Sequence, residues 1–378
     1  MKKQWIALTF VVLIFVVGIG VYSRIHIKRD VPILIENEPA RGLKSANVKS
    51  NDFLIKGVAY EIDEKENHLL LIAPAQTDNT LIADKEYLTT MVYEVGSTEE
   101  PAIVNFDMAT HVSACFEPDM AGIYYVTQST QNEATARQLL YVTMDKTRLV
   151  RISKPDELVS TGVIMSGDWA IYGTSKGEIK LGKASADEPV LLYDLSEMMG
   201  ENYAITKIRH FQDENIIFVS AQKDGSDKTS LFAIKKNRKP ELLAESIIDF
   251  DANEVAGIAV YIEVDEAESR LFSYSTASGE KRELHSGSSL YCVALNAEGS
   301  MLVYGERTTE GGLNYNIHIM MVESGASAKL LSEVRLSNRK ILWGKGNTLY
   351  LSMHSVQESS NSILLSDIYR CKFTITTQ

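Results

Sequence analysis

Residues 215–245, NIIFVSAQKDGSDKTSLFAIKKNRKPELLAE, decide the fold, because they contain a unit that returns along the whole chain. Ile216 to Ser220 is a β-branched and aromatic run that favours a strand, and Asp224-Gly225-Ser226 is a polar turn in which glycine can adopt a positive φ. Leu231 to Ile234 and Leu242-Leu243 supply two further apolar runs. The stretch therefore predicts three short strands joined by turns.

The aromatic-centred strand of this unit recurs at intervals of 43 to 47 residues. The central residues of these copies are Tyr125, Tyr172, Phe218, Tyr261, Tyr304 and Tyr350. Leu71 is the centre of the same strand one repeat earlier, offset by a longer insertion around Gln76 to Glu86. One apolar run precedes the aromatic strand and two follow it in most copies, and four strands in about 45 residues are typical of a β-propeller blade. The sequence predicts an all-β, seven-bladed propeller over residues 53–378, with six or eight blades as alternatives.

The last predicted blade, from about residue 335, shows three strands where the others show four. A missing outer strand leaves an unpaired sheet edge, and propellers commonly fill that edge with a strand from the other terminus. The predicted closing strand is Val31 to Ile35, inside a linker over residues 23–52. Alternatively, this stretch is only a tether.

An uncharged, mostly aliphatic run of 18 residues, Trp5 to Tyr22, follows a short basic head at residues 1–4. A helix of this length nearly spans a hydrocarbon core of about 30 Å, and aromatic residues stand at both of its ends. We expect a single-pass signal-anchor helix in the cell membrane, with residues 1–4 cytoplasmic and the propeller on the extracytoplasmic side. A cleavable signal peptide is the alternative, although its apolar segment normally has only about 7 to 15 residues.

The body of the chain is acidic. Residues 1–30 carry a net +4 of the total −12, so the remaining residues carry −16, and this balance argues against nucleic acid as a partner. Cysteine occurs three times, at Cys115, Cys292 and Cys371, without a CxxC spacing. We expect buried small hydrophobic residues rather than a disulfide framework or a zinc site, because each lies in an apolar run.

Three features of the unit resemble the repeat of TolB-type and WD40-like propellers and of the propeller domains of prolyl-oligopeptidase-type enzymes. They are the Lys223-Asp224-Gly225 turn, the strand from Ser230 to Ile234 and Glu241-Leu242-Leu243. The resemblance spans about residues 53–376 and implies the fold, whereas propellers of this kind serve many functions.

Motifs of catalysis and metal binding are absent from the sequence. No GxSxG nucleophile elbow and no HExxH occurs, and the histidines are scattered along the repeats. Asp249 to Asn253 has the opening spacing of a calcium loop, but Glu254 stands where glycine is needed and Val260 where a bidentate glutamate belongs. No catalytic, cofactor-binding or metal-binding residue is predicted, and no cofactor.

Carboxylates are frequent in the turns that follow the predicted innermost strands. Turns of this kind ring the central channel of a propeller on one face, where ligands bind. The predicted channel-mouth residues are Glu117, Asp119, Asp213, Glu214, Glu254 and Glu298, which would suit a cation or a basic peptide. The plainer interpretation is that they belong to ordinary polar turns.

These features favour a non-enzymatic binding or scaffold module at the membrane with a protein or peptide partner. The alternative is a propeller enzyme, a lyase or glycan-active protein, with its site at the central channel. Convergent charged side chains in the channel would favour the enzyme, and a smooth or apolar rim would favour the binding module. A sensory role would need a separate membrane partner, because only four residues precede the apolar run.

Overall fold

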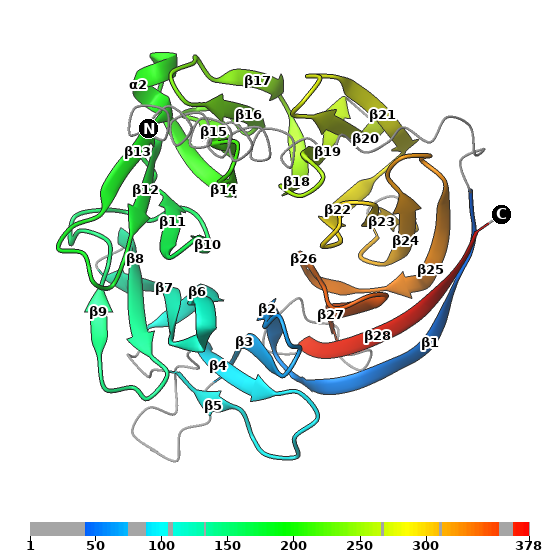
Figure 1. Cartoon of the computed structure of the whole chain (residues 1–378), viewed down its shortest axis with the longest axis horizontal. Coiled ribbons are helices and arrows are strands. Elements are labelled where there is room, and N and C mark those ends of the chain that lie inside the picture. The colour runs from blue at the N-terminus through cyan, green and yellow to red at the C-terminus, as the bar shows by residue number, and fades with distance from the viewer. Residues whose placement is uncertain are drawn as a thin grey trace, which may run out of the picture. The chain divides into compact units, whose positions relative to one another are not determined.

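Seven four-stranded antiparallel sheets stand around a central axis in the computed structural model (Figure 1). The structure describes residues 42–74, 88–104, 109–131, 134–265, 268–309, 312–354 and 366–377. Each sheet is one blade, which confirms the predicted seven-bladed, all-β propeller. Blades 1 to 6 follow one another along the chain as β2–β5, β6–β9, β10–β13, β14–β17, β18–β21 and β22–β25, and blade 7 combines β26–β28 with β1.

The two inner positions of each blade are filled in chain order. The innermost strands are β2 (Val58–Ile62), β6 (Thr110–Phe116), β10 (Ile164–Ser166), β14 (Tyr203–Phe211), β18 (Ile247–Asn253), β22 (Leu290–Leu295) and β26 (Leu336–Trp343). The second strands are β3 (His68–Pro74), β7 (Gly122–Gln131), β11 (Trp169–Gly173), β15 (Ile216–Lys223), β19 (Ile258–Asp265), β23 (Met301–Arg307) and β27 (Thr348–His354).

The two outer positions follow the same order except at the closure. The third strands are β4 (Leu88–Glu94), β8 (Ala134–Thr143), β12 (Glu178–Gly182), β16 (Thr229–Lys235), β20 (Glu268–Ser275), β24 (Tyr315–Met321) and β28 (Ser366–Thr377). The outermost strands are β5 (Ala102–Ile103), β9 (Leu149–Arg151), β13 (Val190–Asp194), β17 (Glu241–Ala244), β21 (Lys281–Gly287), β25 (Ser327–Val334) and β1 (Leu43–Lys56). Short helical turns, η2 (Pro118–Met120) and α2 (Leu195–Met199), connect strands.

The stretch at residues 215–245 forms β15, β16 and β17, the outer three strands of blade 4. Gly225 has a φ of 75° in the turn between β15 and β16, as the turn chemistry predicts. Phe218 in β15 is fully buried, and so are the equivalent residues of the other second strands. The aromatic repeat therefore marks the position in each blade that is covered on both faces.

Buried apolar side chains form seven clusters, and each cluster lies between two neighbouring blades. Tyr172 of blade 3, for example, packs with Tyr124 of blade 2, and Phe218 of blade 4 packs with Tyr261 of blade 5. Because every cluster is shared, burial of apolar surface depends on both neighbours being in place, and closure of the ring stabilises the whole.

Blade 7 is closed by β1, which pairs antiparallel with β28 from Leu43 opposite Thr377 to Lys56 opposite Asp367 (Figure 1). An N-terminal strand therefore completes the three C-terminal strands, as expected. The segment differs from the expected one: residues 43–52, assigned to a linker, form most of this strand, and Val31 to Ile35 lies outside the described residues. Leu43 and Ala46 are buried against blade 6, which fixes this more polar segment in place.

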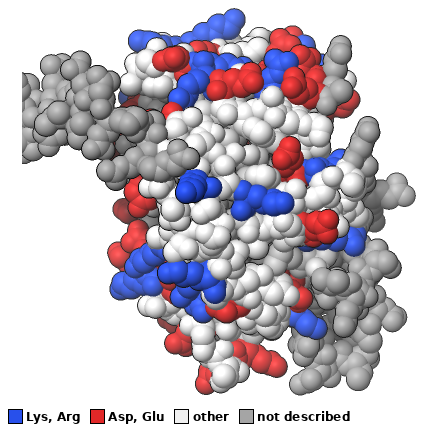
Figure 2. Space-filling view, turned by 90° about the vertical axis from the view of Figure 1, so that its right-hand side faces the viewer, with Lys and Arg blue, Asp and Glu red and all other residues white. Residues whose placement is uncertain are grey.

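Figure 2 views the rim from the side of β1, β25 and β28, where basic and acidic residues are interspersed. The outer edge of β1 carries Lys44, Lys49 and Lys56, all exposed. Lysines on an outermost strand oppose pairing with another chain, because each added strand would bury their charges.

Two further predictions concern the cysteines and the membrane-spanning helix. The three cysteines are free and buried, which confirms their predicted role as small hydrophobic residues. Among the described residues no helix has the length and apolar character to cross a membrane, and Trp5 to Tyr22 lies outside this part of the chain.

Candidate functional site

A cavity of about 750 Å³ runs through the centre of the ring and is lined by the innermost strands of all seven blades. Six charged side chains from four of these blades face it: Glu61, Lys207, Arg209, Asp249, Asp251 and Lys340. None of them was predicted as a site residue. The charges balance by number, so the way in which they pair decides what the channel can bind.

Four of the six charges form two ion pairs between blades 4 and 5. The Nζ of Lys207 lies 2.7 Å from Oδ1 of Asp249, and the Nε of Arg209 lies 2.6 Å from Oδ1 of Asp251. The second oxygen of each aspartate accepts a backbone N–H of blade 6, from Val293 to Asp249 at 3.1 Å and from Leu295 to Asp251 at 2.9 Å. Three neighbouring blades are thus joined by side chains that alternate along β14 and β18.

The pairing holds Arg209 and Asp251 in their charged states. Burial by itself would raise the pKa of Asp251, but the nearby charges of Arg209 and Lys207 and the N–H of Leu295 outweigh it and lower the pKa below 3.8. Burial would lower the pKa of Arg209, yet Asp251 raises it. Residues that stay charged and are bonded on both sides act as structural links rather than as proton carriers.

Glu61 and Lys340 form an incomplete version of the same arrangement between blades 7, 1 and 2. Glu61 of β2 accepts the N–H of Phe116 in β6 at 2.6 Å, just as Asp251 accepts that of Leu295. The Nζ of Lys340 in β26 lies 5.3 Å from the ring centroid of Tyr60 in β2. Within the described residues, no carboxylate oxygen lies within 4.0 Å of this nitrogen.

The strand register explains why this cation lacks a partner. In β26, Ile341 and Leu342 pair with Leu351 and Tyr350, just as Ile208 and Arg209 of β14 pair with Val219 and Phe218. Lys340 precedes Ile341 as Lys207 precedes Ile208, and both line the channel. Lys340 therefore occupies the position of Lys207. The partner of Lys207 is Asp249 of β18. Asp249 lies opposite Ile262 of β19, and Ile262 directly follows the central Tyr261.

The corresponding residue of blade 1 is apolar. Val58 lies opposite Ile72, the residue after the central Leu71, so it stands where Asp249 stands in blade 5. Glu61 lies opposite Leu70 and takes the place of Asp251, but the counterpart of Arg209 in blade 7 is Leu342. The cation and the carboxylate are offset along the channel, and each lacks the residue that its equivalent binds.

The offset leaves both groups with pKa values near neutrality. Burial raises the pKa of Glu61 to about 7, against the N–H of Phe116 and the charge of Lys340. Water in the channel reaches Lys340, yet the surrounding strands desolvate it and lower its pKa to about 8; Glu61 opposes this shift, and Arg209 and Lys207 reinforce it. The buried Cys115 thiol nearby has a raised pKa, so it stays uncharged.

The predicted channel-mouth residues lie in turns between the first and second strands of blades 2, 4, 5 and 6. None of the six lines the described wall of the channel cavity. Glu117 accepts the Tyr141 hydroxyl at 2.6 Å, Glu254 accepts the Asp213 N–H at 2.6 Å, and Glu298 accepts the Asn296 side-chain amide at 2.8 Å.

The two remaining predicted residues, Asp119 and Glu214, are exposed in turns of blades 2 and 4. Of the six, the structure joins one pair across blades, since Asp213 of blade 4 is bonded to Glu254 of blade 5. Glu117 and Asp119 share a turn of blade 2, Glu214 follows Asp213 in blade 4, and Glu298 lies in blade 6. Their role in binding remains a prediction.

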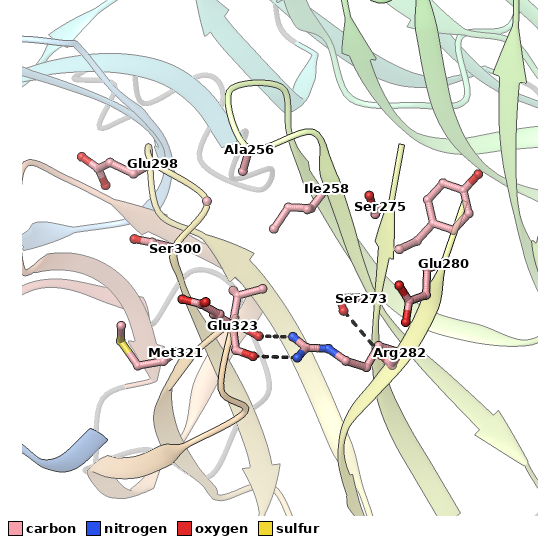
Figure 3. Close-up of a pocket in the computed structure, with 13 residues that line it drawn as sticks. Ala256, Ile258, Ser273, Ser275, Glu280, Arg282, Glu298, Ser300, Met321 and Glu323 are labelled. Carbon is pink, nitrogen blue, oxygen red and sulfur yellow. Dashed lines mark hydrogen bonds between the residues drawn. The ribbon is translucent and has the colours of Figure 1, made fainter. Parts of the chain in front are cut away.

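Glu298 lines a second pocket, of about 500 Å³, between blades 5 and 6 (Figure 3). Arg282 crosses this pocket from β21 and donates to the carbonyl oxygens of Val322 and Glu323, the latter at 2.6 Å. Its guanidinium is therefore used in joining the blades. The carboxylates at the opening, Glu280 and Glu298, are exposed to solvent.

The sequence carries a signal for the channel charges in the strands rather than in the turns. Lys207 and Arg209, like Asp249 and Asp251, are separated by one apolar residue, which places each pair on one face of a strand. The Asp249 to Asn253 run is not a calcium loop but part of β18, which agrees with its missing glycine and glutamate. In the part of the chain that the structure describes, no three His, Cys, Asp or Glu residues are grouped so that they could hold a metal ion.

Comparisons with known proteins identify the fold. No protein-family profile and no curated protein matches the chain. Among solved structures, an oligogalacturonate lyase in complex with manganese has a TM-score of 0.61 at 11% identity, over 85% of this chain and 90% of that chain. The propeller domain of Cps50 (Swd1) from Myceliophteria thermophila has a TM-score of 0.57 at 12% identity, over 87% and 100%.

The TolB protein of Acinetobacter baumannii is also similar, with a TM-score of 0.43 at 14% identity over 83% of this chain and 66% of that chain. At such identities a structural likeness reports the arrangement of strands and not the activity. The chain shares its propeller fold with the lyase and with the Cps50 (Swd1) domain, as the repeat predicts, and the side chains of its own channel decide what it can bind.

Proposed function

We propose that this protein is a membrane-anchored, non-enzymatic binding module that takes a group of its protein or peptide partner into the central channel of the propeller. The observation that carries the proposal is the cavity of about 750 Å³ to which all seven blades contribute and into which charged side chains converge. Concave sites with a few convergent polar groups are where ligands usually bind.

Convergent charges were expected of an enzyme, but their bonding favours a binding role. Lys207, Arg209, Asp249 and Asp251 are paired with one another, and both aspartates also accept backbone N–H groups. Groups held in this way offer a rigid, preformed wall, which lowers the cost of ordering on binding. They are poorly suited to exchanging protons with a substrate.

A thermal-shift measurement on the full chain, purified in detergent, tests binding in the channel. The probes are sodium lactate, sodium phosphate, galactose and the blocked peptides acetyl-Ala-Glu-Ala-amide and acetyl-Ala-Lys-Ala-amide. We expect at least one peptide probe to raise the melting temperature, because a ligand that binds only the folded state stabilises it. The channel-mouth variant Ala297→Trp should abolish the shift, since Ala297 is exposed and lines the cavity. A shift that survives in this variant would place the binding elsewhere.

The proposed anchor is residues 5–22, with residues 1–4 in the cytoplasm and the propeller on the extracytoplasmic side. Its support is the uncharged run of 18 residues in the sequence. The full chain should remain in the membrane fraction after a carbonate wash, whereas a chain beginning at residue 23 should be released. Protease added to intact cells should cleave the propeller; protection of the propeller would reverse the topology.

A propeller enzyme with an acid–base pair at the channel is the second candidate. The pKa values of about 7 for Glu61 and about 8 for Lys340 favour it, because groups that exchange protons near neutral pH suit general acid–base catalysis. One structural neighbour is an oligogalacturonate lyase, so oligogalacturonate is a sensible first substrate. Shorter products with the unaltered chain, and none with Lys340→Met, would support this candidate against the binding module.

A further inference from the structure

We propose that the gap between Lys340 and Glu61 is a binding site for a single carboxylate group, which bridges the offset cation and the carboxyl group of the channel wall. The inference rests on the proposed function, because it names the chemistry of the group that enters the channel. It stands on the register of three strands, β26, β2 and β6. It also stands on the two complete copies, in blades 4 to 6, of a cation paired with a carboxylate that accepts a backbone N–H of the next blade.

The comparison between the copies shows what the gap lacks. In the complete copies a carboxylate oxygen lies 2.7 Å from Lys207 and 2.6 Å from Arg209. Lys340 holds the position of Lys207, but the residue in the position of Asp249 is Val58. A carboxylate from outside the chain would supply the missing acceptor at this point, with a charge-assisted hydrogen bond.

The charges around the gap select a group with one negative charge. Of the three channel cations only Lys340 is unpaired among the described residues, so one negative charge balances it. A doubly charged phosphate would place its second charge in a channel that already holds Asp249, Asp251 and Glu61. Protonated Glu61 can donate its O–H to a bound carboxylate, and the N–H of Phe116 holds its other oxygen at 2.6 Å.

Binding at this site takes up protons. The groups that face it are Glu61 and Tyr60 from β2, Lys340 from β26, Cys115 from β6, Lys207 and Arg209 from β14, and Asp249 and Asp251 from β18. Glu61 and Lys340 change charge between pH 6 and 8.5, because their pKa values are about 7 and 8. Because the bound state contains neutral Glu61 and charged Lys340, affinity should fall more than about tenfold from pH 6 to pH 8.5.

The test uses the full chain and two carboxylate probes with matched neutral partners. Sodium lactate is compared with lactamide, and acetyl-Ala-Glu-Ala-amide with acetyl-Ala-Gln-Ala-amide, by ligand-observed NMR titration at pH 6 and 8.5. We expect both carboxylates to bind and both amides to fail. Binding of lactate alone identifies small acids as the source of the group, and binding of the peptide alone identifies an acidic side chain of a partner. Equal binding of carboxylate and amide, no binding of either carboxylate, or stronger binding of sodium phosphate overturns the inference.

Variants separate the roles of the two residues. Lys340→Met should weaken carboxylate binding about tenfold or more, since a charge-assisted hydrogen bond contributes about 1.5–3 kcal/mol. Lys340→Arg should bind at pH 6 and lose only the part of the pH dependence that comes from Lys340, because guanidinium keeps its proton at pH 8.5 whereas Glu61 still ionises. Glu61→Gln should bind at pH 6 and lose most of the pH dependence. The exposed Lys228→Met is the control for loss of one positive charge.

The outcomes distinguish this inference from the proposed function. If Ala297→Trp abolishes probe binding while Lys340→Met leaves it unchanged, the channel binds ligands without this site, and only the inference fails. If neither variant changes the binding, the channel is not the binding site and both fail. Retained thermal stability of Lys340→Met, or intact binding by Lys340→Arg, shows that a loss of affinity does not come from misfolding.

Discussion

The Nζ of Lys207 lies 2.7 Å from Oδ1 of Asp249 and joins the innermost strands of blades 4 and 5. Its neighbour Arg209 repeats the contact with Asp251 at 2.6 Å. Both aspartates accept backbone N–H groups of blade 6. The strands pair within each blade, so these side chains supply hydrogen bonds and ion pairs between blades. The channel wall is a part of what holds neighbouring blades together, in addition to the apolar clusters between them.

Removing one of these aspartates should weaken the ring. Asp251→Ala leaves Arg209 without its carboxylate and the N–H of Leu295 without its acceptor. We expect the free energy of unfolding to fall by about 2–4 kcal/mol, since breaking a largely buried ion pair leaves the remaining charge without a partner. Denaturant titration monitored by tyrosine and tryptophan fluorescence measures the loss, and the double variant Arg209→Met/Asp251→Leu should recover most of it.

The matched control for this prediction is an exposed ion pair. Lys154 and Glu188 lie 2.9 Å apart with side chains 47% and 73% exposed. Glu188→Ala should leave the free energy of unfolding almost unchanged, because water and salt screen the pair. A loss for Asp251→Ala no larger than this would contradict a stabilising role of the channel pairs.

Stability should pass through a minimum between pH 7 and 8. The pKa of Glu61 is raised from 4.5 to about 7, so between these values the folded state retains a proton that the unfolded state has lost, and stability falls as pH rises. The pKa of Lys340 is lowered from 10.5 to about 8, so above pH 8 the unfolded state binds the extra proton and stability rises. Melting temperatures measured from pH 5 to 10 test both limbs.

Single substitutions show which residue causes the fall in stability below pH 7 and which causes the rise above pH 8. Relative to the unaltered chain, Glu61→Gln should flatten the fall below pH 7, and Lys340→Met should flatten the rise above pH 8. Below pH 4 both variants should lose stability as the unaltered chain does, because Asp251, with its lowered pKa, contributes stability that is lost as pH falls through its folded value. A profile that neither substitution alters would show that other groups dominate.

Truncation tests the closing strand. A chain beginning at residue 42 retains β1 and its pairing with β28, whereas a chain beginning at residue 57 exposes the edge of β28 and uncovers the buried contacts of Leu43 and Ala46. We expect the first to melt at the temperature of the full chain and the second to melt lower and to aggregate. Equal melting of the two by calorimetry would show that closure is dispensable.

The thiols should be protected in the folded state. Cys115, Cys292 and Cys371 are free and buried, and burial raises the pKa of Cys371 to about 11. Ellman's reagent should therefore label no thiol of the native chain at pH 8, and three per chain in denaturant, because the thiolate is the reacting form. A reducing agent should leave the melting temperature unchanged. Fewer than three thiols in denaturant would contradict the free state.

The sequence by itself determined the ring. The centres of the second strands are buried on both faces and therefore apolar, so the run of large residues at Leu71, Tyr125 and their equivalents up to Tyr350 marks the repeat. Glycine at the turn of residues 224–226 marks where the chain reverses. Their number and spacing led to seven blades. The last blade has three predicted strands where the others have four, so the sequence also predicts closure by an N-terminal strand.

Only the tertiary structure decided which strand closes the ring and where the charges meet. Leu43–Lys56 is too polar to resemble a strand, and it forms because β28 offers an otherwise unpaired edge and blade 6 covers Leu43 and Ala46. The channel cluster unites β2, β14, β18 and β26, whose charged residues lie far apart in the sequence. Their pairing depends on register shifts within β2, β14 and β18, which a repeat measured from one aromatic residue to the next does not contain.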